Sequence, residues 1–261
     1  MAIIKGNYIK GIVGNLTYRE HQGQQLVQGK AHTIPSHRTE ATRKAAKFFG
    51  KASKLARGIR WGLAEICHKY SDGTMNFRLN TEILRCLNVV KDSDTQQLNL
   101  NPHSFRNLAG FEFNAGSMVK NHFFVQPQVS LQGTTLKVDI PDLNIPVDVK
   151  FPKDRLDRCT LMIAVEQVDL ENSLVSYAEI QLMDIPFSYR NTEVPGQSFQ
   201  FEIEPGCLCI TAISLQYIEK TFVGENIINS KKFNPSAILH AQIAEGEVDS
   251  AKTKDWWNYK L

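Results

Sequence analysis

The sequence predicts an α+β fold in which a helical hairpin precedes a C-terminal antiparallel β-sandwich. Between residues 39 and 91, apolar side chains recur at steps of three and four, which is the period of one helix face. From about residue 110 the apolar period changes to two, and Pro and Gly separate the short stretches. That second pattern is typical of sandwiches and barrels.

The N-terminal segment, residues 1–38, is expected to form a β-hairpin followed by an extended arm. Residues 16–21 and 25–28 have strand-like patterns, and Gln22-Gly23 between them matches a turn. Pro35 disfavours a helical conformation at the residue before it, so residues 31–39 are expected to be extended. The other glycines lack the Gly-Lys-Ser/Thr ending of a phosphate loop, and we interpret them as flexible punctuation.

The helical hairpin is expected over residues 39–100. A long helix is predicted from Thr39 to Tyr70, and Ser71-Asp-Gly ends it. A second helix is predicted from Met75 to Lys91, followed by a polar loop that we take as the domain boundary. The apolar face of the first helix is Phe48, Ala52, Leu55, Ile59, Leu63, Ile66 and Tyr70. On the same helix, Gly58-x-x-x-Gly62 permits another segment to approach closely.

A stripe of basic residues runs beside this apolar face. Its members are Arg43, Lys47, Lys51, Lys54 and Arg57. Residues 1–70 hold thirteen Lys or Arg against three Glu, whereas the rest of the chain holds seventeen against twenty-four acids. A basic segment can bind either the acidic part of another copy or the phosphates of a nucleic acid. Both partners remain open at this point.

The sandwich is expected over residues 101–247 and an aromatic tail over residues 248–261. Leu161 to Val165 is apolar on both faces, as in a central strand. The tail carries Trp256, Trp257 and Tyr259, each of which can bury a large area in a pocket. Two alternatives are open for this tail, since it can pack on its own domain or dock on another subunit.

No pattern in the sequence indicates catalysis, a cofactor or a metal. The five cysteines are an odd number without a Cys-x-x-Cys pair, so reduced, buried thiols are expected. No two histidines have the spacing of a helical zinc site. Asp139, Asp142 and Asp148 lie close in the sequence, and we interpret them as turn acids rather than calcium ligands. We therefore expect that the protein is not an enzyme.

The chain has neither a secretory signal pattern nor an apolar run long enough to span a membrane. It is therefore expected to be cytoplasmic, with incorporation into a virion-like particle as an option, and to have no membrane partner.

Three stretches carry a resemblance. They are Lys5-Gly6, the Gly11-x-x-Gly14-Asn15-Leu-x-Tyr18 pattern, and the segment from Phe48 to Arg60. Together they resemble the opening of uncharacterised Bacteroidota proteins, some of which are found near mobile or phage-like elements. The resemblance covers about the first quarter of the chain and implies no activity and no functional residue. It favours a structural role.

These observations together predict a self-assembling structural subunit, such as a phage-like, filament or shell component. The expected contacts are the N-terminal arm, the basic helix and the C-terminal tail, and the expected state is a homo-oligomer. One alternative is a nucleic-acid-binding protein that uses the helix over residues 39–70. A second alternative is a ligand- or carbohydrate-binding sandwich module.

Overall fold

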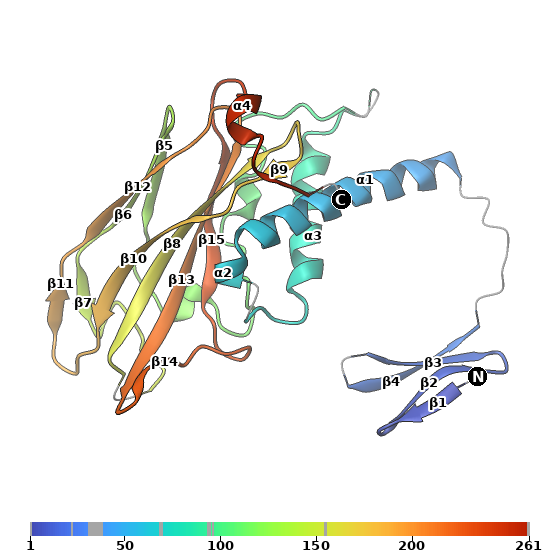
Figure 1. The fold of residues 1–261 in the computed structure, drawn as a ribbon, viewed down its shortest axis with the longest axis horizontal. Coiled ribbons are helices and arrows are strands. Elements are labelled where there is room, and N and C mark those ends of the chain that lie inside the picture. The colour runs from blue at the N-terminus through green and yellow to red at the C-terminus, as the bar shows by residue number, and fades with distance from the viewer. Residues whose placement is uncertain are drawn as a thin grey trace. The chain divides into compact units, whose positions relative to one another are not determined.

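The computed structural model describes residues 2–21, 23–30, 39–67, 70–92, 95, 97–153 and 156–259. The chain divides into two compact units, Met1–Ala46 and Lys47–Leu261, and each is described by itself. Helices and mostly antiparallel sheets make up the structure, which confirms the α+β class (Figure 1). None of the described helices is long and apolar enough to cross a membrane.

The N-terminal unit contains a four-stranded antiparallel sheet in the order β1-β2-β3-β4, where a single hairpin was predicted. Its strands are β1 (Ala2–Lys5), β2 (Tyr8–Val13), β3 (Leu16–His21) and β4 (Gln24–Gly29). Gly6-Asn7 and Gly14-Asn15 are the two-residue loops of the first two hairpins, with φ of 60° and 56° at the glycines. A positive φ at the first loop position is the type II′ arrangement that suits right-twisted strands. These glycines therefore shape turns, and the predicted arm, residues 31–38, lies outside the described residues.

Three helices follow where two were predicted, because the first predicted helix, Thr39 to Tyr70, is divided at Leu63. They are α1 (Glu40–Gly62), α2 (Ala64–Cys67) and α3 (Met75–Val89). The Thr39 hydroxyl accepts a 3.2 Å hydrogen bond from the Thr42 amide, so Thr39 caps α1. The boundary between the two units falls within α1.

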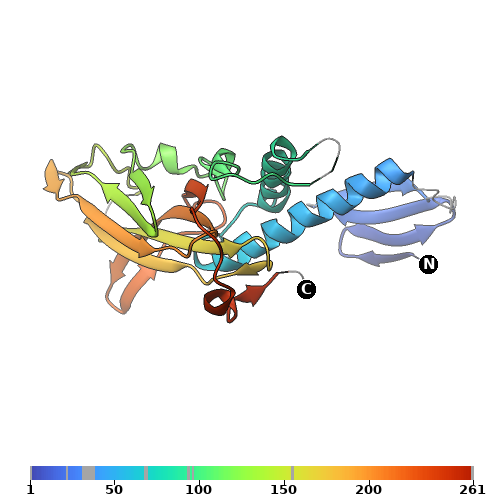
Figure 2. The same cartoon turned by 90° about the horizontal axis from the view of Figure 1, so that it is seen from above.

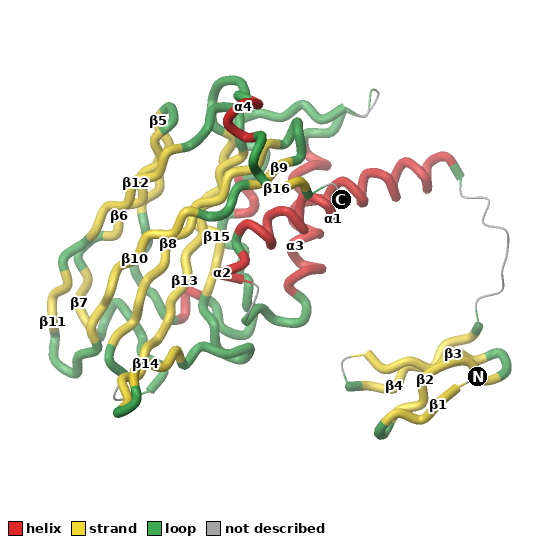
Figure 3. The backbone as a smooth tube through the Cα atoms, viewed as in Figure 1, coloured by secondary structure: helices red, strands yellow, loops and turns green. Residues whose placement is uncertain are grey.

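The second unit is built around a seven-stranded sheet whose long central strands are β8 (Arg158–Asp169) and β13 (Leu208–Thr221). The other members are β9 (Leu174–Val175), β10 (Glu179–Pro186), β14 (Gly224–Ile227), β15 (Ser236–Ile243) and β16 (Trp257–Asn258). Figure 3 shows β8 and β13 running the length of this sheet. The short helix α4 (Ser250–Thr253) leads into a C-terminal segment that passes beside α1, as Figures 1 and 2 both show.

Shorter elements complete this unit. They are the three-stranded sheet of β5 (Gln128–Gln132), β6 (Thr135–Ile140) and β12 (Gln197–Glu202), the pair β7 (Leu143–Ile145) and β11 (Thr192–Val194), and the 3₁₀ turns η1 (Arg106–Leu108) and η2 (Val119–Asn121).

Two apolar cores lie on opposite faces of the central sheet, because side chains alternate along each strand. On one face, Leu161 and Ile163 of β8 pack with residues of β6 and β12, such as Val138 and Phe199. On the other face, Ala164 of β8 and Ala212 of β13 pack with α1 and α3.

The second core corrects the expected domain division of residues 39–100 and 101–247. The helices and the sheet share one core that begins at Ala52, so residues 47–100 belong to the same unit as residues 101–247. The helices supply the layer that covers one face of the central sheet, and they do not form a domain of their own.

Candidate interaction surfaces

Four of the five predicted basic residues on α1 are exposed. They are Arg43, Lys47, Lys51 and Lys54. Within the part of the chain that the structure describes, none of the four forms an ion pair. Exposed cations without partners keep their full charge available to an acidic surface or to phosphates.

Arg57 has a different environment. It is half-buried, and its guanidinium donates a 2.6 Å hydrogen bond to the Tyr259 carbonyl. The guanidinium carbon also lies 5.5 Å from the centre of the Trp257 ring, a cation–π distance. Arg57 thus holds the C-terminal segment in place. Because its guanidinium is used in these contacts, Arg57 is not part of the exposed basic stripe on α1.

The aromatic tail packs on its own unit, which is one of the two alternatives that the sequence left open. β16 pairs with β9, and the Trp257 ring stacks on Trp61 with centroids 4.5 Å apart. Tyr259 is only 5% exposed, and Trp256 is half-buried. As a consequence, Tyr259 is unavailable for docking on another subunit in this conformation.

The two glycines of the Gly58-x-x-x-Gly62 pattern accommodate side chains rather than a second helix. A Cβ at Gly58 would lie 2.9 Å from Cδ1 of Tyr259. A Cβ at Gly62 would lie 2.5 Å from Cδ of Glu166 on β8. The pattern predicted a close approach of another segment to this helix, and the segments that approach it are the C-terminal tail at Gly58 and the central sheet at Gly62.

Glu166 is a buried carboxyl that the sequence reasoning missed. It is 0% exposed, and neither carboxylate oxygen has a hydrogen-bond partner among the described residues. Burial raises the pKa of Glu166 well above its ordinary value, because the surroundings disfavour the charged form of the carboxyl. One signal was visible, since Glu166 directly follows the run Leu161–Val165 that was recognised as a doubly buried strand.

All five cysteines are buried and free, as the sequence predicted. Burial, assisted by the nearby Glu166 carboxyl, raises the pKa of the Cys67 thiol to about 12. A thiol with such a pKa is protonated and unreactive at neutral pH. No cluster of three or more His, Cys, Asp or Glu that could hold a metal occurs in the described ranges.

A small groove brings three predicted residues together. Lys51, Lys54 and Tyr259 line a cavity of about 390 Å³ whose other walls are largely apolar. Those walls are Leu55, Leu87, Leu98, Leu100, Phe105, Leu170, Glu171 and Ser173. The groove places two ammonium groups beside apolar side chains, an arrangement that suits an amphipathic partner.

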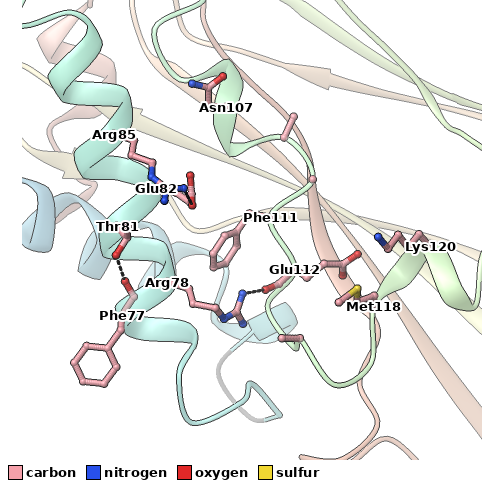
Figure 4. Close-up of a pocket in the computed structure, with 13 residues that line it drawn as sticks. Phe77, Arg78, Thr81, Glu82, Arg85, Asn107, Phe111, Glu112, Met118 and Lys120 are labelled. Carbon is pink, nitrogen blue, oxygen red and sulfur yellow. Dashed lines mark hydrogen bonds and ion pairs between the residues drawn. The ribbon is translucent and has the colours of Figure 1, made fainter.

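A larger cleft, which we call the α3 cleft, has one part between α3 and residues 107–120 and a second part between residues 109–127 and the strands β13 and β15. It consists of two adjoining hollows of about 850 and 500 Å³ that share Ala109, Gly110, Glu112 and Lys120. Figure 4 shows the larger hollow, with Arg78 reaching from α3 to the Glu112 carbonyl at 2.7 Å. Phe77 and Phe124 on its two parts are 67% and 56% exposed.

The cleft has one strongly organised charge pair at its edge. The carboxylate of Asp72 accepts hydrogen bonds from the Arg78 guanidinium, the Thr74 hydroxyl and the Ala115 amide. Although burial acts to raise it, these hydrogen bonds lower the pKa of Asp72 to about 2. Arg78 is therefore a structural clamp between α3 and the segment after η1, and it is not a free anion-binding group.

Comparison of the chain with protein-family models, with curated proteins and with solved structures finds no match.

Proposed function

We propose that this protein is a self-associating structural subunit whose copies contact one another through the N-terminal sheet. The observation that carries the proposal is that this sheet has no core of its own. No described residue between 2 and 46 is buried. Seven large aliphatic side chains there are between 38% and 80% exposed: Ile3, Ile4, Ile9, Ile12, Val13, Leu16 and Val27.

A small sheet needs a covered apolar face or a packed helix to be stable. Burying one aliphatic side chain of this size contributes about 1.5–3 kcal/mol. The exposed aliphatic residues therefore supply the driving force for covering the sheet with a second protein surface, and contact between copies meets that need.

Strand pairing defines one face of this sheet. Val13 pairs with Leu16, and Tyr18, two residues further along β3, pairs with Val27. These four side chains consequently share one side of the sheet, and we call them the N-terminal apolar face. Thr17 points to the opposite side, because side chains alternate along a strand.

The first experiment is light-scattering mass across a gel-filtration peak, with absorbance at 260 and 280 nm recorded on the same run. The full chain is expected to give a discrete multiple of 29.5 kDa without nucleic acid. Val13→Glu/Val27→Glu should lower that mass, whereas Thr17→Glu/Gln28→Glu, with the same charge change on the other face, should not. A wild-type chain that stays monomeric at both low and high salt would remove the proposal.

A second candidate is nucleic-acid binding by the exposed cations of α1, because Arg43, Lys47, Lys51 and Lys54 have no ion pair in the described ranges. In that case nucleic acid co-elutes at low salt and is released as salt rises. Lys47→Glu/Lys51→Glu should abolish this co-elution, and Lys231→Glu/Lys232→Glu is the charge-matched control on another exposed segment. The same pair of variants tests whether these cations bind an acidic neighbouring copy, since that contact would also be salt-sensitive.

A further inference from the structure

The turn between β13 and β14 presents two apolar side chains to solvent. Thr221 pairs with Gly224, so Phe222 and Val223 are the two residues of the loop. Their exposed fractions are 107% and 94%. We call this pair the apolar tip.

Turn formation does not account for the residues of the tip. Two-residue hairpin loops favour Gly, Asn and Asp, which adopt the required dihedral angles at little cost. A Phe and a Val at this position do not stabilise the turn. Burying their side chains against another surface would cost no hydrogen bond. Exposed apolar groups at a protruding point are typical of contact sites.

The α3 cleft is a matching receptor on the same chain. Its smaller hollow is walled by apolar side chains, namely Val119, Phe123, Phe124, Val125, Pro127, Ile213, Ala237, Ile238 and Leu239. Phe124 is 56% exposed, so no described residue of the second unit covers this part of the cleft. An apolar knob entering it would remove both surfaces from water.

A chain cannot place its own tip in its own cleft. Ile213 lines the cleft, and Thr221 precedes the tip on the same strand. Eight residues separate them on β13, which corresponds to about 26 Å at the rise of a β-strand. The knob must therefore come from another molecule.

Charge favours a protein partner over an anionic membrane. Glu219 and Glu225 flank the tip, and Lys220 is the one cation between residues 219 and 225. The larger hollow of the cleft is lined by three cations and two acids: Arg78, Arg85, Lys120, Glu82 and Glu112. The two Glu of the hairpin already pair with Lys153 and Arg158, so apolar burial carries the contact. In the cleft, Arg78 and Arg85 pair with Asp72 and Glu82, which leaves Lys120 as the cleft cation without an ion pair among the described residues.

We propose that the apolar tip of one copy inserts into the α3 cleft of a second copy. This inference rests on the proposed self-association and adds a specific contact to it. Tip and cleft are different surfaces, so the contact is head-to-tail, and it either closes into a ring or continues as a filament.

Cross-linking between singly labelled full-length chains tests the contact, because every native cysteine is buried. One preparation carries Val223→Cys at the tip, a second carries Ala109→Cys in the cleft, and a control carries Tyr189→Cys, another exposed position. With a short bis-maleimide, the tip and cleft preparations should give at least about tenfold more mixed dimer than the tip and control preparations, since a bound neighbour raises the effective concentration. Equal yields, with the full chain still self-associating, would overturn the tip contact and leave the N-terminal contact standing. A monomeric full chain would overturn both.

A second variant tests the same contact without the cross-linker. Phe222→Ser/Val223→Ser should lower the light-scattering mass of the wild-type assembly, and Tyr189→Ser should leave it unchanged. Neither tip residue contributes to a core, so the tip variant should unfold at the wild-type temperature. If the tip variant keeps the full mass and instead loses binding to vesicles of anionic phospholipid, the tip is a membrane contact and the proposal is wrong.

Discussion

Gly62 packs tightly against Glu166 of the central sheet, and replacing it with alanine should lower the stability of the protein. The added Cβ would lie 2.5 Å from Cδ of Glu166 and 2.8 Å from both its Cγ and Oε2. Glu166 is fully buried, so its side chain cannot swing into solvent to make room. Either the helix or the strand has to shift.

The size of the effect follows from these contacts. Overpacking a filled core by one methyl group costs about 1–3 kcal/mol. For a unit of this length, each kcal/mol lowers the midpoint of thermal unfolding by about 2–4 °C, which gives a decrease of about 2–12 °C. Gly50→Ala is the matched control, because a Cβ at Gly50 in the same helix would meet nothing within 4 Å. That substitution should stabilise the protein by up to about 1 kcal/mol through helix propensity.

Urea and thermal unfolding of the full chain measure both effects. Combining Gly62→Ala with Glu166→Ala should relieve the clash, so that the alanine at position 62 no longer destabilises in that background. A Gly62→Ala protein as stable as Gly50→Ala, with Glu166 in place, would refute the close packing of α1 on β8.

Three further predictions concern buried groups of the second unit. The pKa of Glu166 is raised above 4.5 in the folded state, so its contribution to stability is complete below that pH and is lost as the pH rises, by up to about 1.4 kcal/mol per pH unit; Glu166→Gln should remove this decline in unfolding experiments between pH 4.5 and 7. Tyr259→Ala should lower the free energy of unfolding by about 3–5 kcal/mol, as for other buried aromatic side chains. The mass of the assembly, measured by light scattering, should stay at the wild-type value. Asp72 has a pKa of about 2 in the fold against 3.8 ordinarily, so its stabilisation is present above pH 3.8 and lost as the pH falls toward 2; Asp72→Asn should therefore destabilise the protein at pH 7 and make little difference near pH 2.

The helices were predictable because their determinants are local. The three- and four-residue spacing of apolar side chains and the turn after Tyr70 lie within the segment that they define. The first two hairpins were missed for a related reason. Gly6-Asn7 and Gly14-Asn15 are turn dipeptides whose role becomes clear only when the strands on both sides are considered together.

The environment of the predicted contact residues on α1 and in the C-terminal tail followed only in part from the sequence. The exposure of Lys47, Lys51 and Lys54 follows from their spacing beside the apolar face of α1. The burial of Tyr259 and the engagement of Arg57 do not follow from spacing, since the two residues are 202 positions apart and meet only after the sheet has formed.

The sequence by itself determined the α+β class, the approximate helix positions, and the buried, unpaired state of the cysteines. The tertiary structure decided that the helices cover the central sheet, that the aromatic tail packs beside α1, and that Glu166 is buried beneath Gly62. The division has one physical reason. Periodicity and turn chemistry act between residues that are neighbours in the chain, whereas the choice of packing partner depends on contacts between segments far apart in it.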